Sequence, residues 1–413
     1  MTLGSTRRGF LRGIVGSSAL GAGVAASGIP AAGAEGRGVA APDGTLVVLH
    51  LVGGLDGLSV LVPWGESAYA SRRPGIAVAA PGERYGAIDL GRGLGLHPAL
   101  APVWNTLGRT DRLAVICGVG VPDGEDGERS HVPSRAFLHR GGRDASDGWA
   151  TRMFRFEGLG ADAVWSFGPG PHPMFDGLPG AVAAPRPVVS IGAHRDPRAA
   201  FDAVAHAYRG DEPVEQAGRA ALAASARWSH VDWTSAADRL ARGYPDGRLG
   251  RSLAATADMI RADDGLRLVA IDHDGYDTHV DQGDGRAGVL AHRLDRVARA
   301  LSAFWADVSR RDDRRGPVTV VVVSEFGRAI DENGSGGTEH GRGGIALALG
   351  DQVVGGVHGD LPDIERDDVW PVSVDVRRVF ADAASSHGFR PWRGGIFAGL
   401  PLPNRSLGLL LSP

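Results

Sequence analysis

The stretch that decides the fold of this 413-residue chain is VTVVVVSEFGR, residues 318–328. Its first six residues are β-branched, with no alternation of polar and apolar side chains. Such a run predicts a central strand buried on both faces, as in a parallel sheet. Polar side chains follow at once, at Ser324, Glu325 and Arg328. Ligands bind outside the carboxyl ends of strands in open α/β sheets, so this junction is a candidate site.

Further strands and helices are predicted around this stretch. The predicted strands cover residues 45–52, 112–119, 163–167, 188–190, 266–271 and 345–349. Apolar residues at helical or amphipathic spacing predict helices at 97–107, 130–138, 148–154, 212–228, 249–261, 286–310 and 374–387. The order of strand 266–271, helix 286–310 and strand 318–323 predicts a right-handed crossover. Residues 345–349 and 352–357 are predicted to form a hairpin at or near the sheet edge, and residues 142–250 an inserted cap over the sheet.

Composition narrows the possible chemistry. A formal net charge of -4 gives no reason to expect nucleic acid as a partner. All 44 basic residues are Arg, and the absence of Lys excludes Schiff-base chemistry, a Lys general base and a phosphate-loop Lys. The one cysteine, Cys117, lies inside an apolar run and is predicted to be a small buried hydrophobe rather than a nucleophile.

The N-terminus resembles a twin-arginine export signal. The motif STRRGFLR, residues 5–12, precedes a Gly/Ala-rich segment, and AGA at 32–34 fits a small-residue cleavage site. We therefore expect a signal peptide at residues 1–34 and a mature domain at 35–413, working in the periplasm or outside the cell. No other stretch approaches 18 uninterrupted apolar residues, so no membrane span is expected in the mature form.

Side chains able to bind metal follow several of the predicted strands. In a parallel sheet such positions meet at one edge, so they are expected to converge. They are Asp56, Ser130 with His131 at a helix start, Asp277, His279, Glu325 and His340. Plainer interpretations remain open: Asp56 as a turn residue, Ser130 as a helix cap, and Asp272 and His273 as structural residues.

Several His and carboxylate side chains around one pocket fit one or two divalent ions. Zinc is the expected cofactor, with calcium, magnesium or manganese as alternatives. Two close metals would suit hydrolysis of a phosphate or sulfate ester, one activating the attacking oxygen and one stabilising the leaving oxygen. Ser130 would then be the metal-activated nucleophile, with a metal-bound water as the alternative.

Five motifs in this order resemble a secreted bacterial family, catalogued as domain of unknown function 1501 within the alkaline phosphatase/sulfatase-like superfamily. They are GGLDGL (53–58), RSH (129–131), DTH (277–279), SEFGR (324–328) and GTEHG (337–341). The resemblance covers nearly the whole mature chain. It implies a three-layer α/β/α fold with a mostly parallel central sheet, alkaline phosphatase-like, and helices on both faces.

The resemblance also assigns roles to individual residues. Metal ligands are implied at Asp56, Asp277, His279, Glu325 and His340. Ser130 and His131 occupy the catalytic position at the helix start, and Arg129 and Arg328 are the expected substrate-binding residues.

Two functions follow from these expectations. The first is a metal-dependent hydrolase acting on a small-molecule or polymer phosphate or sulfate ester outside the cytoplasm. The second is a non-catalytic binding or structural protein with an incomplete metal site, which recognises a ligand or a co-exported partner protein. Glu325-Phe326 stands where the superfamily usually has Asp-His, and this favours the second. Ser130 and the acidic/His cluster favour the first.

Overall fold

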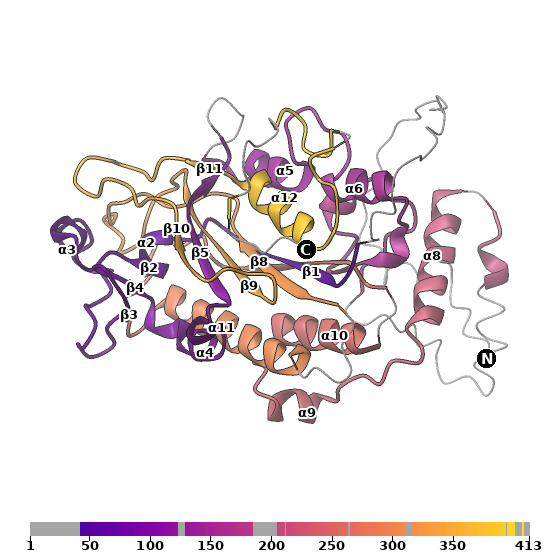
Figure 1. The fold of residues 1–413 in the computed structure, drawn as a ribbon, viewed down its shortest axis with the longest axis horizontal. Helices are drawn as coiled ribbons and strands as arrows, with labels where there is room; N and C mark the ends of the chain where they lie inside the picture. The colour runs from indigo at the N-terminus through magenta and orange to yellow at the C-terminus, as the bar shows by residue number, and fades with distance from the viewer. Residues whose placement is uncertain are drawn as a thin grey trace, which may run out of the picture.

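The computed structural model describes residues 42–122, 129–184, 205–210, 212–262, 265–309, 316–393, 395–400 and 407–408. The expected signal peptide at 1–34 and the expected strand at 188–190 lie outside these residues. The described part is an α/β protein built on a mixed sheet of mostly parallel strands (Figure 1).

The central sheet runs in the order β10-β5-β9-β8-β1-β7-β6, and β11 also pairs with β5. Every pair is parallel except those that β9 makes with β5 and β8. The bounds are β1 Thr45–Val52, β5 Leu113–Gly120, β6 Val164–Phe167, β7 Leu268–Asp274, β8 Val318–Val323, β9 Gly344–Gly350, β10 Gly356–His358 and β11 Val374–Asp375. The prediction of a largely parallel sheet is therefore confirmed.

The hairpin predicted from residues 345–349 and 352–357 is wrong. β9 lies inside the sheet, antiparallel to both of its neighbours, and all of its residues are buried. β10 pairs with β5 instead, on the far side of that strand from β9. The uninterrupted apolar run IALAL indicated a strand buried on both faces, which an edge hairpin does not provide.

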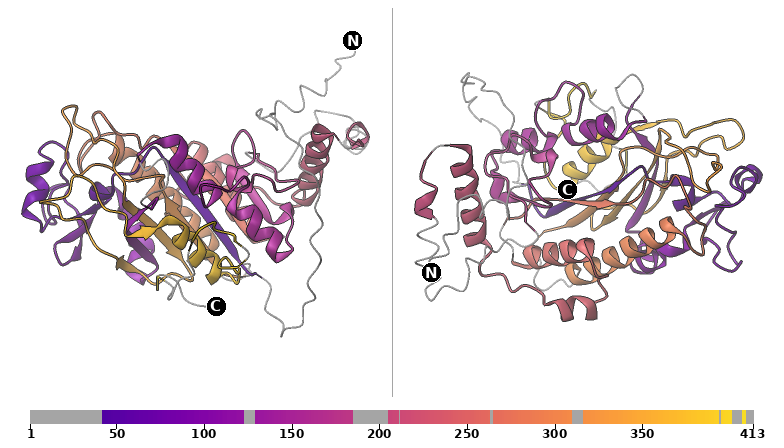
Figure 2. Two further views of the ribbon diagram at one scale, coloured as in Figure 1. Left: turned by 90° about the horizontal axis from the view of Figure 1, so that it is seen from above. Right: turned by 180° about the vertical axis from the view of Figure 1, so that it is seen from behind.

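Helices cover both faces of the sheet (Figures 1 and 2). One face packs on α4 (Ala101–Thr106), α10 (Arg248–Ala262) and α11 (Val289–Val308), through side chains such as Val47 and Leu49 of β1. The other face packs on α5 (His131–Arg140), α6 (Trp149–Glu157) and α12 (Val376–Ser386), through Leu46 and Val48 of β1. Successive residues of a strand point to opposite faces, so one apolar strand supplies both cores.

Cys117 of β5 is fully buried, as predicted. Burial raises the pKa of its thiol to about 12. A thiol so rarely ionised is a poor nucleophile, which agrees with a packing role.

Part of the region expected to form a cap belongs to the main body. β6 is a strand of the central sheet, α6 packs in one core and α10 in the other. α8 (Pro213–Arg227) stands at one end of the described molecule (Figure 1), and its side chains line a pocket with Val164 and Trp165 of β6. Short elements described in this region include η3 Ala161–Ala163, η4 Pro173–Phe175 and α9 Ala236–Ala241.

A small antiparallel sheet, β2-β4-β3, follows β1 in the chain. Its strands are β2 Leu61–Val62, β3 Ile88–Gly91 and β4 Leu94–Leu96. The helical pieces around it are α2 Gly57–Val60, α3 Ser67–Arg72, η1 Pro98–Leu100 and η2 Gly108–Thr110. This unit carries Arg73, whose guanidinium pairs with Asp56.

Candidate metal centre

The candidate site lies at the carboxyl edge of the central sheet. β1, β5, β7 and β8 all run the same way, so the segments that follow them meet at one edge. His131 opens α5 after β5. Asp277 and His279 follow β7, and Glu325 follows β8. β9 runs in the opposite direction, so His340, which precedes it, reaches the same edge.

The carboxylate of Asp277 is the centre of a cluster of three imidazoles. Its Oδ1 lies 3.0 Å from His279 Nε2 and 3.1 Å from His340 Nε2. Its Oδ2 lies 3.3 Å from His131 Nε2. The Nε2 atoms of His279 and His340 are 3.0 Å apart. His131, Asp277 and His340 each offer a ligand atom within 4.8 Å of the others. We call His131, Asp277, His279 and His340 the strand-end cluster.

Each imidazole of the strand-end cluster is held from behind through its Nδ1. The oxygens that face Nδ1 of His131, His279 and His340 are, respectively, Glu325 Oε1 at 3.0 Å, Glu339 Oε2 at 3.1 Å and the Arg129 carbonyl at 3.0 Å. A carbonyl or ionised carboxylate oxygen only accepts hydrogen bonds, so each of these oxygens can accept one from a protonated Nδ1. With the ring proton on Nδ1, a neutral imidazole has its lone pair on Nε2, the atom that faces Asp277.

In that tautomer three Nε2 lone pairs face one carboxylate, and a cation among them would offset the repulsion between these acceptors. Zinc binds imidazole nitrogen at about 2.0–2.1 Å, and tetrahedral geometry then places neighbouring ligand atoms about 3.4 Å apart. The contacts of 3.0 to 3.3 Å around Asp277 are close to this spacing. An acceptor behind each ligating imidazole is also the usual second layer of a zinc site. The strand-end cluster fits a divalent transition metal.

The strand-end cluster is open to solvent on one side. Exposure of its side chains ranges from 24% for His340 to 46% for Asp277. His131 and His279 lie between these values. A small molecule can therefore approach a cation held there.

Arg328, expected to bind substrate, is fully buried beneath the strand-end cluster. It donates to backbone carbonyls of three strand-end loops, those of Gly53, Gly54, Tyr276 and Thr338. Its Nη2 also lies 2.5 Å from Asp277 Oδ1. Burial alone would raise the pKa of Asp277, but hydrogen bonds from Arg328 and His340 lower it. Arg328 therefore fixes the loops and the ionised Asp277 rather than facing solvent.

Glu325, expected to be a metal ligand, stands behind His131. Its side chain is completely buried and accepts hydrogen bonds from the Gly53 backbone N–H at 2.9 and 3.0 Å. Its Oε1 contacts His131 and its Oε2 lies 3.2 Å from His50 Nε2. Burial alone would raise the pKa of Glu325, but the contacts with His50, Gly53 and His131 hold it well below its usual value.

The structure does not bring Asp56, another expected ligand, into the strand-end cluster. Its carboxylate is buried and pairs with the buried guanidinium of Arg73 at 2.6 and 3.1 Å. Ser59 and Gln282 donate to the same carboxylate, each at 2.6 Å. Burial alone would raise the pKa of Asp56, but the Arg73 charge and these hydrogen bonds lower it. The cation beside Asp56 is thus an arginine.

The expected nucleophile, Ser130, lies at the rim of the site. It is the exposed N-cap residue of α5, and its side chain makes no capping hydrogen bond. Its neighbours on both sides belong to the site: the Arg129 carbonyl holds His340, and His131 belongs to the strand-end cluster. Arg129 is itself exposed.

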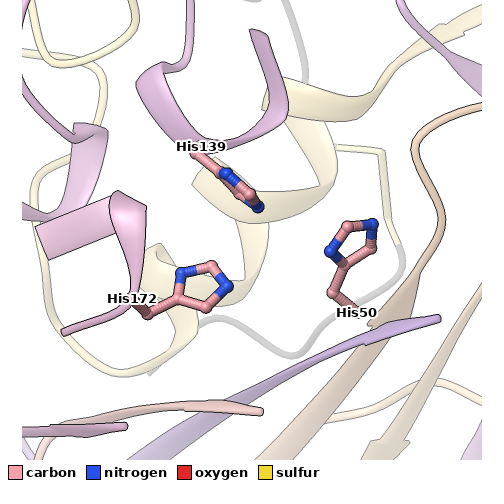
Figure 3. Close-up of side chains that lie close together, drawn as sticks. All are labelled: His50, His139 and His172. Atoms are coloured by element: carbon pink, nitrogen blue, oxygen red, sulfur yellow. The ribbon is translucent and has the colours of Figure 1, made fainter. Parts of the chain in front are cut away.

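Several polar residues near the site were not predicted to belong to it. Glu339 and Asn333 support His279, because Asn333 Nδ2 donates to Glu339 Oε1 at 2.7 Å and to the His279 carbonyl at 3.0 Å. His50, His139 and His172 lie close together (Figure 3), and His50 contacts Glu325. The sequence feature that could have identified His50 is its place as a lone imidazole in the apolar strand TLVVLHLV. A polar group buried in such a strand needs a hydrogen-bond partner.

Comparison with known proteins supports the resemblance to the domain of unknown function 1501 family. Residues 192–393 match the family described as "Protein of unknown function (DUF1501)". The matched segment contains Asp277, His279, Glu325 and His340, but not His131. No curated protein matches the chain. None of the helices in the described ranges is long and apolar enough to cross a membrane.

The Asp56–Arg73 pair yields a stability prediction. Arg73→Met should lower the free energy of unfolding by about 3–5 kcal/mol, because it leaves the Asp56 carboxylate buried without its cation. Asp56→Asn combined with Arg73→Met should cost less than Arg73→Met alone. Urea denaturation of the three proteins measures both effects.

The matched control is Arg299→Met, which breaks an exposed pair with Asp295 on α11. It should change stability by about 1 kcal/mol or less. Equal losses for Arg73→Met and Arg299→Met would contradict the role given to the buried pair.

Proposed function

We propose that this protein is a metal-dependent hydrolase of phosphate or sulfate esters. A divalent cation, zinc foremost and calcium, magnesium or manganese as alternatives, would be held by His131, Asp277 and His340, with His279 beside them. One observation carries the proposal: three imidazoles, each anchored through Nδ1, turn Nε2 toward one carboxylate at a solvent-open edge. One metal ion is proposed at the strand-end cluster, because Asp56, the remaining expected ligand, is paired with Arg73.

The roles of the chain's own residues follow from their positions. A bound cation would act as a Lewis acid, polarising an ester oxygen and stabilising negative charge in the transition state. Arg328 keeps Asp277 ionised and oriented, and Glu325 and Glu339 orient His131 and His279. Arg129, exposed at the rim, is the available guanidinium for an anionic ester. Ser130 is the chain's own candidate nucleophile, and water is the alternative.

A second candidate function is a metal-holding protein without catalysis. Catalytic zinc sites keep three protein ligands and an open position, whereas structural sites have four. His279 Nε2 lies 3.0 Å from both Asp277 Oδ1 and His340 Nε2 and could supply a fourth ligand. A centre closed in this way would serve recognition of a ligand or a co-exported partner.

Metal content and turnover distinguish the two functions. We expect the mature protein to bind zinc and to hydrolyse an aryl phosphate or an aryl sulfate. His340→Ala should lose one equivalent of zinc and lower kcat/KM by at least about 100-fold, since a ligand and its anchoring contact are removed together. Elemental analysis and an assay of the released phenol measure these quantities.

The control for this experiment is His358→Ala on the edge strand β10, away from the strand-end cluster, which should keep both metal and activity. Metal without turnover of either ester would favour the second candidate function. A wild-type protein without metal would contradict both functions.

The nucleophile is tested by Ser130→Ala. If Ser130 attacks the ester, this variant should keep its zinc and its fold but lose at least about 1,000-fold in kcat, as expected when a covalent nucleophile is removed. The loss is measured with the same aryl ester at saturating concentration. Retention of activity would assign the attack to water and leave the metal-dependent hydrolase in place.

We also propose that the chain is exported by the twin-arginine pathway. Replacing Arg7 and Arg8 together by Lys keeps the charge but removes the motif, and should leave the uncleaved precursor in the cytoplasm. Arg37→Lys, beyond the expected cleavage site, is the control and should be exported normally. Cell fractionation with N-terminal sequencing shows where each variant is located and whether it has been cleaved. Export of the double variant would contradict the proposal.

A further inference from the structure

Behind the strand-end cluster lies a second group of imidazoles, buried in the core. His50 comes from the middle of β1, His139 from α5 and His172 from the turn before η4. Their exposed fractions are 1%, 8% and 5%. The three rings face a common space, and each offers a nitrogen within 4.8 Å of the others (Figure 3). We call these residues the buried histidine cluster.

A carboxylate completes the buried histidine cluster. Asp272 Oδ1 lies 3.2 Å from His50 Nδ1 and 3.2 Å from His172 Nε2. Its side chain is 36% exposed, whereas the three imidazoles are buried. Asp272 therefore connects the cluster with solvent and gives an ion a way in.

The strongest indication of a missing partner is on His139. Its Nε2 is buried and has no hydrogen-bond partner among the described residues. The ring packs edge-on against the rings of His50 and His172, with centroids 5.5 and 4.6 Å away. A buried polar atom is nearly always satisfied, so an orphan nitrogen beside two further imidazoles points to a bound species.

We propose that His50, His139 and His172, with Asp272, bind a second divalent transition metal. Three imidazole nitrogens and one carboxylate oxygen suit zinc, cobalt, nickel or copper better than calcium or magnesium. The two 3.2 Å separations from Asp272 Oδ1 are close to the spacing of about 3.4 Å between neighbouring tetrahedral zinc ligands. The metal would supply the partner that His139 Nε2 lacks.

The surroundings of His50 already favour a positive charge at this place. The ring lies between two carboxylates, Asp272 on Nδ1 and Glu325 on Nε2. Burial alone would lower the pKa of His50, but its hydrogen bonds with Asp272 and Glu325 raise it to about 9. Two carboxylates beside one buried ring favour a positive charge there, and a metal on Nδ1 would supply it.

One hydrogen bond of His172 would be lost on metal binding. His172 Nδ1 accepts a hydrogen bond from the Met174 backbone N–H at 3.3 Å, which places the ring proton on Nε2. To bind metal through Nε2, His172 has to move that proton to Nδ1 and give up this one long hydrogen bond.

This inference is independent of ester hydrolysis, because the two clusters are separate. Glu325 lies between them, with one oxygen on His131 and the other on His50. No residue is shared by the two ligand sets. A substitution can therefore remove the metal ligands of one cluster and leave those of the other in place. Failure of one proposal is then distinguishable from failure of the other.

The test is a titration of the chelator-treated, full mature protein with Co²⁺, followed by the visible absorption of the bound ion. We expect two equivalents for the wild type, one for His139→Leu and one for His340→Ala, and none for the double variant. His358→Ala, outside both clusters, should keep two. Uptake of a single equivalent that His139→Leu leaves unchanged would overturn the buried site.

His139→Leu could lose cobalt by misfolding, so a measurement on the wild type stands beside it. Crystals grown with Co²⁺ should give anomalous difference density among His50, His139 and His172, separate from any peak at His340. Density for an ordered water there, with no anomalous signal, would overturn the proposal even if the strand-end cluster is fully loaded.

Discussion

The site depends on the compensation of one buried negative charge, that of Glu325. It sits at the end of the central strand β8 with no exposed surface, where an isolated carboxylate would be very costly. The Gly53 backbone N–H and the imidazoles of His50 and His131 surround it and offset that cost. Gly53 has a φ of 128°, and a Cβ there would lie 2.3 Å from the Asp277 backbone nitrogen. Only glycine therefore lets β1 turn tightly enough to reach Glu325.

Two buried arginines hold the carboxylates and the loops around the site in place. Arg73 pairs with the buried Asp56, and Arg328 contacts one oxygen of Asp277 while binding carbonyls of the surrounding loops. A guanidinium stays charged at any physiological pH and presents five donors in a fixed plane, so it holds several loops at once. Such a framework is built whether or not metal is present. The imidazoles can therefore be positioned before a cation arrives, which limits the entropy lost on binding.

The sequence predicted the sheet better than the site, for physical reasons. Uninterrupted apolar runs identified β1, β7 and β8, because burial on both faces leaves no room for polar alternation. The same rule applied to β9, yet its direction and neighbours depend on pairing with β5, which is remote in the chain.

His131, Asp277 and His279 lie together at the edge where parallel strands were expected to bring them, and His340 joins them because β9 runs antiparallel. Spacing could not show that Arg73 would reach Asp56, or that His172, from a Pro/Gly-rich loop, would lie beside Asp272. Those contacts depend on how the chain folds between the residues.

Glu325 links the two histidine clusters, because one of its oxygens faces His131 and the other faces His50. A carboxylate that accepts from His131 Nδ1 makes that ring a stronger donor toward a cation, as supporting acceptors do in other metal sites. A positive charge on His50, from a proton or a metal, draws electron density in Glu325 toward Oε2, the oxygen that faces His50. The hydrogen bond between Glu325 Oε1 and His131 Nδ1 is then weaker. Because Glu325 is fully buried, water screens the effect little. The occupant of the buried histidine cluster should therefore tune the affinity of the strand-end cluster without touching any of its ligands, and by linkage the reverse holds equally.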